Sequence, residues 1–296
     1  MKRVVLLVAV VLVLGVGGGW AGQRPQGPEA LKQARALFFK GAGLARQGKL
    51  AQAERLLTRS LKLFESTTGP RSESVAIVLN NLGVIYRAMG RYAEADKSLS
   101  RALAILPSHH PKRPTVLNNL AGVYAREGRL ELAVKTFKQA LALRTRALGP
   151  DDPRLASIWT NLGAVYMKAR RYPEAEKAFK RALEIINRAR PPQPGKAVGV
   201  LNNLGSLYRA TKRYDLAEKT LTRALSLAEK TYGPTHPFVG AVMTNLGNLY
   251  RARGEFLMAW KAYSTALKIF EHSLGPSHPW TRRTRQALAA SKAKNR

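Results

Sequence analysis

A self-similar pattern that returns every 42 residues constrains this chain more than any other feature of its sequence. Each copy begins with Asn-Leu-Gly or, once, Asn-Leu-Ala. A tyrosine stands three residues after this tripeptide ends, and two alanines stand nine and sixteen residues after the tyrosine. One interval is shortened to 38 residues, between the copies at Asn81 and Asn119. The five copies are Asn81-Leu82-Gly83, Asn119-Leu120-Ala121, Asn161-Leu162-Gly163, Asn203-Leu204-Gly205 and Asn245-Leu246-Gly247.

Each copy reads as two amphipathic helices joined by a short break. In the unit from Val198 to Thr231, apolar residues recur at helical spacing on both sides of Lys212-Arg213-Tyr214-Asp215. Small residues at the helix crossing allow the two backbones to approach. Because one hairpin cannot bury its own apolar face, consecutive hairpins must stack. The sequence therefore predicts an all-α protein: one continuous right-handed α-solenoid of six helix hairpins plus a C-terminal capping helix.

The pattern Leu-Gly-x-x-Tyr followed by two spaced alanines resembles the tetratricopeptide repeat family, and within it the kinesin light chain type. The 42-residue interval, the loop Gly233-Pro234-Thr235-His236-Pro237 and doubled asparagines carry the resemblance, which covers roughly residues 34 to 280. It implies a non-catalytic scaffold that binds a protein or peptide in a concave groove lined by the first helices of the repeats. The doubled asparagines are Asn80-Asn81, Asn118-Asn119 and Asn202-Asn203.

The predicted organisation has four parts. A signal peptide occupies residues 1–22, and a linker with the start of the first helix occupies 23–33. Six repeats fill 34–275, and a capping helix with a basic tail fills 276–296. Proline after Asp152, His236 and His278 predicts helix starts in the connections, because proline fits the first helical position.

The N-terminal segment has the three-part form of a secretory signal peptide. Lys2 and Arg3 precede an apolar run from Val4 to Val16, and small residues follow as far as Gly22. We therefore expect export, into the periplasm of a bacterium. The alternative is an uncleaved inner-membrane anchor, although the apolar run is shorter than the about 20 residues that a spanning helix needs. The chain contains no cysteine, which excludes lipoprotein attachment.

The family resemblance places the candidate peptide-binding residues on the first helices. An asparagine amide both donates and accepts hydrogen bonds, which suits contact with a peptide backbone, and basic residues one to two turns later could bind acidic side chains. The alternative is that the asparagines bond the neighbouring repeat and fix its stacking. The charged clamp of chaperone-type members is not reproduced, so no strict need for a C-terminal carboxylate is predicted. The candidates are Asn80, Asn81, Asn118, Asn119, Asn161, Asn202, Asn203, Asn245, Arg87, Arg126, Lys168, Arg209 and Arg251.

The net charge of +32 bears on the class of partner. A basic groove favours an acidic peptide, whereas basic residues on the outward second helices favour an anionic envelope polymer or lipid surface. Nucleic acid is disfavoured, because no recognised nucleic-acid module is present and the export signal argues against it. A third interpretation is a genome-wide arginine bias without a dedicated partner. The outward cations include Lys97, Arg101, Lys135, Lys138, Lys177, Lys180, Arg181, Lys219 and Arg223.

The sequence predicts no enzyme activity, no cofactor and no metal. There is no thiol nucleophile, and no phosphate loop or dinucleotide motif is present. His236 and His278 occupy equivalent loops, but a whole repeat separates them, which is too far for shared ligation of a metal ion. We interpret the histidines, including His109 and His110, as loop and helix-capping residues.

Overall fold

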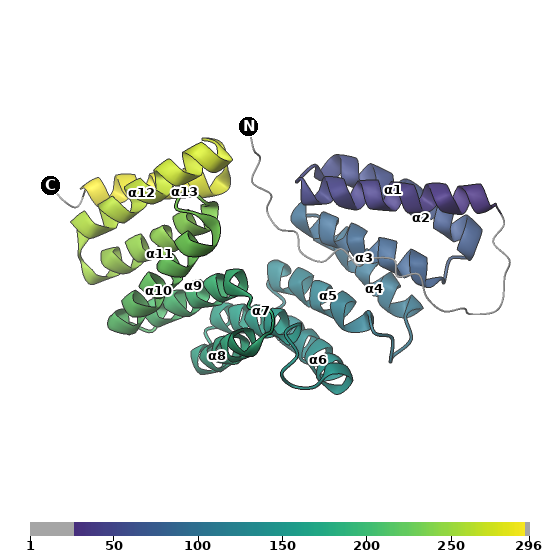
Figure 1. Ribbon diagram of the computed structural model, residues 1–296, viewed down its shortest axis with the longest axis horizontal. Coiled ribbons are helices and arrows are strands. Elements are labelled where there is room, and N and C mark those ends of the chain that lie inside the picture. Colours follow the sequence, from purple (N-terminus) through teal and green to yellow (C-terminus); the bar gives the residue numbers. More distant parts are fainter. Residues whose placement is uncertain (1–26, 294–296) are drawn as a thin grey trace. The chain divides into compact units, whose positions relative to one another are not determined.

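The structure is a computed structural model that describes residues 27–293. The predicted signal peptide, residues 1–22, lies outside this range. Within it, all regular structure is helical, and 13 helices form six consecutive hairpins followed by a final helix (Figure 1). This confirms the all-α class and the plan of six hairpins plus a capping helix. None of the helices in the described range is long and apolar enough to cross a membrane.

The helices divide into two compact units, residues 27–149 and 150–293, which we call the N-terminal and the C-terminal unit. Within the N-terminal unit, each odd-numbered helix pairs with the helix that follows, α2 packs on α3, and α4 packs on α5. The first helices α1, α3 and α5 also contact one another in succession. The six helices are α1 (Pro28–Arg46), α2 (Leu50–Thr68), α3 (Glu73–Ala88), α4 (Tyr92–Ile105), α5 (Arg113–Glu127) and α6 (Leu130–Leu148).

The C-terminal unit repeats this arrangement and adds a last helix. Its first helices α7, α9 and α11 contact one another in succession, and α13 packs on α12. The ring of Trp280, in the first turn of α13, lies 5.7 Å from that of Phe270, so α13 covers the last hairpin as predicted. The helices are α7 (Leu155–Lys168), α8 (Tyr172–Arg188), α9 (Pro194–Ala210), α10 (Tyr214–Tyr232), α11 (Pro237–Arg253), α12 (Phe256–Leu274) and α13 (Pro279–Ala293).

The glycine of each Asn-Leu-Gly copy marks the point where the two helices of a hairpin cross. A side-chain carbon added at Gly83 would lie 2.5 Å from Cγ of Leu99, and one added at Gly163 would lie 2.7 Å from Cε1 of Phe179. Gly205 and Gly247 meet Leu221 and Tyr263 in the same way. Each buried partner stands sixteen residues after its glycine, and the glycine provides the space that this large side chain fills.

Helix starts after the histidine-proline pairs agree with the prediction, whereas the start after Asp152 does not. His236 caps α11 by accepting from the backbone N–H of Phe238 at 3.2 Å, and α11 begins at Pro237. Nδ1 of His278 accepts from Trp280 at 3.2 Å in the same way. Asp152 instead accepts from the backbone N–H of Arg154 at 2.8 Å, in a turn before α7, and that helix begins later, at Leu155.

Candidate functional site

Two pairs of the predicted asparagines join neighbouring first helices. Nδ2 of Asn119 on α5 donates to Oδ1 of Asn80 on α3 at 2.8 Å, and Nδ2 of Asn245 on α11 donates to Oδ1 of Asn202 on α9 at 2.8 Å. Asn80 is fully buried and Asn119 is 2% exposed. Each pair thus hydrogen-bonds successive repeats together, which is the stacking role that the sequence had left as an alternative.

The other asparagines differ in their access to solvent. Asn81 is buried and donates to the carbonyl oxygen of Ile77 at 2.9 Å, one turn earlier in its own helix. Asn80, Asn81 and Asn119 are therefore all buried, and Nδ2 of Asn80 has no hydrogen-bond partner among the described residues. Asn118, Asn202, Asn203 and Asn245 are partly buried, and Asn161 is exposed, so groove contact by these residues stays a prediction.

The predicted cations also lie on the first helices. Arg126, Lys168 and Arg251 are exposed, whereas Arg87 and Arg209 are half-buried. The Arg87 guanidinium lies so close to Gly122 of α5 that a side-chain carbon added there would overlap it. Burial and then the charge of Arg126 lower the pKa of Arg87, so two cations from adjacent repeats of the N-terminal unit lie near each other.

A matching pair lies in the C-terminal unit. Burial raises the pKa of the Tyr263 hydroxyl, and the charges of Arg251 and Arg209 oppose that shift, which places both guanidinium groups near this ring. Nε of Arg209 is buried and has no hydrogen-bond partner among the described residues. No Asp or Glu occurs in the sequences of α7, α9, α11 or α13, so these helices carry no anion to neutralise them.

The arginines of the hairpin turns behave differently. They stack on a tyrosine five residues earlier, with guanidinium carbons 4.5 to 4.7 Å from the ring centroids. Three of them also pair with an acidic residue of the preceding repeat within their unit: Arg91 with Glu54, Arg129 with Asp96, and Arg213 with Glu176. Sequence reasoning missed this arrangement, although the repeated five-residue spacing from tyrosine to arginine was visible. The stacked arginines are Arg91, Arg129, Arg171 and Arg213.

Glu176 of α8 gives one of these pairs a pH dependence. Partial burial by itself would raise its pKa, but hydrogen bonds from Arg213 at 2.6 Å and Lys180 at 2.8 Å outweigh it and lower the pKa from 4.5 to about 2. The ionised carboxylate therefore stabilises the fold above the unfolded pKa, and this contribution is lost as the pH falls from 4.5 through about 2.

We expect Glu176→Gln to lower the free energy of unfolding by about 1–2 kcal/mol at neutral pH, a value discounted for solvent screening, and to have little effect near the folded pKa. Urea unfolding across that pH range measures this. Glu229→Gln, at an exposed glutamate that has no ion pair among the described residues, is the control. An equal effect of Glu176→Gln at both ends of the range would contradict the assignment.

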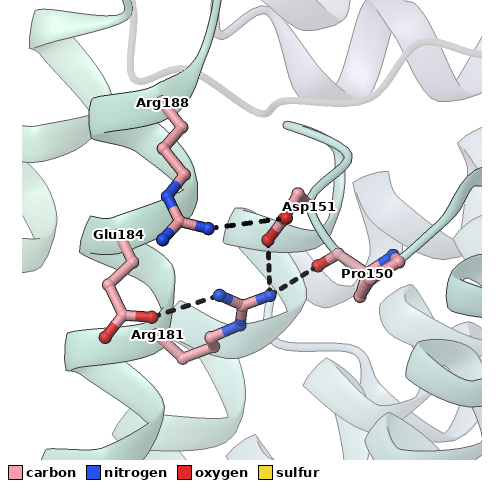
Figure 2. A network of polar contacts seen from close by, with 5 residues as sticks. All are labelled: Pro150, Asp151, Arg181, Glu184 and Arg188. Carbon is pink, nitrogen blue, oxygen red and sulfur yellow. Dashed lines mark hydrogen bonds and ion pairs between the residues drawn. The ribbon is translucent and has the colours of Figure 1, made fainter.

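The loop before α7 is held on α8 by a second charged network (Figure 2). Asp151 accepts from Arg181 at 2.7 Å and from Arg188 at 3.5 Å. Arg181 also donates to the carbonyl oxygen of Pro150 at 2.9 Å and to Glu184 at 3.1 Å. Acidic residues on the second helices and loops thus neutralise several cations there, while Arg87, Arg126, Arg209 and Arg251 form no ion pair within the part of the chain that the structure describes.

Solved structures of low sequence identity share this fold. A putative kinesin light chain with TPR-like repeats from Podosopora anserina aligns with a TM-score of 0.56 and 22% identity, over 69% of this chain and 98% of that one. BtubC from P. vanneervenii aligns at 0.63 and 24%, over 78% and 94%. A Rap protein complexed with Competence and Sporulation Factor aligns at 0.64 and 17%, over 90% and 76%.

A search of curated proteins by sequence found no match. A family model described as tetratricopeptide repeat matches residues 32–108, 112–188 and 197–259. These segments span most of the chain and coincide with the hairpins described above. Members of this family are typically scaffolds for protein–protein interaction. The chain belongs to the tetratricopeptide repeat family.

Proposed function

We propose that this protein is a non-catalytic scaffold that binds an acidic protein segment along its first helices and so supports assembly of an envelope or secretion-related complex. The observation that carries the proposal is the set of cations on these helices without an ion pair among the described residues: Arg87, Arg126, Arg209 and Arg251. Three arginines of the hairpin turns, by contrast, pair with an acidic residue: Arg91 with Glu54, Arg129 with Asp96, and Arg213 with Glu176.

On the face formed by the first helices, we expect the half-buried Arg87 and Arg209 to contribute most to binding. A guanidinium that is partly desolvated and lacks a counter-ion gains more from a carboxylate than an exposed one does, because part of its desolvation has already occurred in folding. Arg209 has a buried Nε without a partner, and Arg251 on the next repeat lies near the same tyrosine. An acidic segment that contacts successive first helices would meet both charges in turn.

Two further considerations support the proposal. The family binds protein partners, and one structural neighbour was solved in complex with Competence and Sporulation Factor. For location, we propose export to the periplasm of a bacterium, on the charged start, apolar run and small residues of the first 22 positions. The N-terminal residue of the protein isolated from cells tests this, since retention of Met1 would favour the anchored alternative.

The test uses a fluorescein-labelled glutamate-rich peptide and measures its binding to the full chain by anisotropy. We expect the double variant Arg209→Gln with Arg251→Gln to weaken binding roughly a hundredfold, because it removes two charge-assisted contacts. A glutamine-rich peptide of the same length should bind weakly to both proteins. Asparagine variants are less suitable probes, because Asn119 and Asn245 help to join the repeats.

The matched control removes the same charge elsewhere. Lys219 on α10 and Lys261 on α12 are exposed, so Lys219→Gln with Lys261→Gln should change binding only about two- to threefold. Equal weakening by the two double variants would contradict the proposed face. That outcome would favour the second candidate, a polyanion-binding envelope protein that acts through exposed second-helix cations such as Lys97, Lys135 and Lys177.

A further inference from the structure

A cavity of about 480 Å³ lies in the C-terminal unit, where α8 is followed by α9. Its walls come from the end of α8, the loop that leads to α9, the first turn of α9 and the second half of α10. The volume is in the range of pockets that hold small organic molecules. The lining residues include three cations, Arg190, Arg223 and Lys230, together with apolar groups such as Ile186, Pro192 and Leu227.

The cavity is located where the other joints of this unit are filled by aromatic rings. At the joint of α10 and α11, the rings of Tyr232 and His236 stack 4.5 Å apart, and Phe238 lies 5.1 Å from each. At the joint of α12 and α13, Trp280 contacts both Phe270 and His278.

The repeat period shows what replaces these rings at the α8–α9 joint. Forty-two residues before Tyr232, His236 and Phe238 the chain has Arg190, Pro194 and Lys196. The aromatic cluster is therefore absent from this joint, and a basic cavity takes its place.

The charges around the cavity are not neutralised within its walls. Arg190 donates to the carbonyl oxygen of Ala189 at 3.1 Å, and neither Arg223 nor Lys230 has an ion pair with any residue that the structure describes. No Asp or Glu is among the lining residues. Arg188, at the end of α8, differs from these three cations because it forms an ion pair with Asp151 (Figure 2).

Arg190, Arg223 and Lys230 are exposed to solvent around this open cavity, so an oxyanion bound there could form charge-assisted hydrogen bonds with all three. The apolar wall is suited to a small hydrocarbon part of the same molecule. We propose that the α8–α9 joint is a binding site for a small organic anion, with a phosphate or carboxylate group held by Arg190, Arg223 and Lys230 and an apolar part against Ile186 and Leu227. The site shares no cation with the proposed peptide-binding face, so it does not depend on that function.

Isothermal titration calorimetry of the full chain at constant ionic strength tests the site, with phenyl phosphate, benzoate and neutral phenol as probes. We expect saturable binding of at least one of the two anions and none of phenol, and the stronger anion identifies the preferred oxyanion. Arg223→Gln and Lys230→Gln should each weaken binding roughly tenfold. Lys219→Gln, which removes the same charge from the exposed face of α10 outside the cavity, should leave binding within about twofold.

A filling variant provides the second readout. Arg190→Tyr places at this joint the residue type that the next joint has at Tyr232, and it should abolish saturable binding while circular dichroism shows unchanged helicity. Absence of binding by both anions, equal binding of phenol, or binding unaffected by Arg223→Gln and Arg190→Tyr would overturn the proposal. The variants Arg209→Gln and Arg251→Gln should retain anion binding, so failure of one proposal is distinguishable from failure of the other.

Discussion

Phe179→Ala is expected to lower the free energy of unfolding by about 3–5 kcal/mol. Phe179 is completely buried on α8, and its ring occupies the space that Gly163 leaves open on α7. Removing the ring takes away its hydrophobic burial and leaves a cavity at the helix crossing. The packing of α7 and α8 on α9 limits how far the hairpin can collapse into the cavity. We therefore expect the free energy of unfolding to fall by nearly the full amount that removal of a large buried side chain costs.

Urea unfolding followed by far-UV circular dichroism measures this effect. Leu216→Ala on α10 is the matched control, because this leucine is 46% exposed and should cost less than about 0.5 kcal/mol. A Phe179→Ala protein that unfolds at the same urea concentration as the parent would show that the crossing of α7 and α8 contributes little to the stability of the unit.

Substitution by alanine at two glycines of the same helix should change the free energy of unfolding in opposite directions. On α9, a carbon added at Gly205 would lie 2.5 Å from Cγ of Leu221, whereas one added at Gly199 meets nothing within 4 Å. We expect Gly205→Ala to destabilise the protein by about 1–3 kcal/mol through overpacking. Gly199→Ala should stabilise it by about 0.5–1 kcal/mol, because alanine loses less backbone freedom on forming a helix.

Thermal and urea unfolding of both variants give the signs directly. A third variant, Gly205→Ala with Leu221→Ala, separates overpacking from other causes. If the clash with Leu221 is the reason, the second substitution should cost less in the Gly205→Ala background than in the parent. Additive costs, or a stabilising Gly205→Ala, would contradict the close packing of α9 on α10.

The sequence alone was sufficient for the fold because the pattern is repeated. A tyrosine and two spaced alanines recur in five copies, with a glycine three residues before the tyrosine in four of them and Ala121 in the other. Each feature corresponds to a packing need that can be stated locally. Gly205 faces Leu221 in its own hairpin, and Ala217 and Ala224 are completely buried on α10. Such contacts join residues that are close in the chain, so they can be predicted from the spacing of residues in the sequence.

The sequence alone could not assign a role to each candidate site residue, and the reason is physical. An asparagine at a given position of a first helix can face a ligand or the next repeat, because its amide can donate and accept hydrogen bonds in either setting. The structure places Asn80 and Asn119 in a buried pair, 39 residues apart, while Asn161 at an equivalent position of α7 is exposed. Likewise, composition showed an excess of cations but could not show which of them have a carboxylate partner from another repeat, as Arg213 has in Glu176.

By itself, therefore, the sequence determined the all-α class, the hairpins, the capping helix and the family, because these follow from periodic burial along the chain. Only the tertiary structure showed which polar side chains form hydrogen bonds or ion pairs between repeats and which do not. It also located the basic cavity between α8 and α10, since a missing aromatic cluster leaves space only when the surrounding helices are in place. Those outcomes depend on distances between residues of different repeats, which the order of residues does not contain.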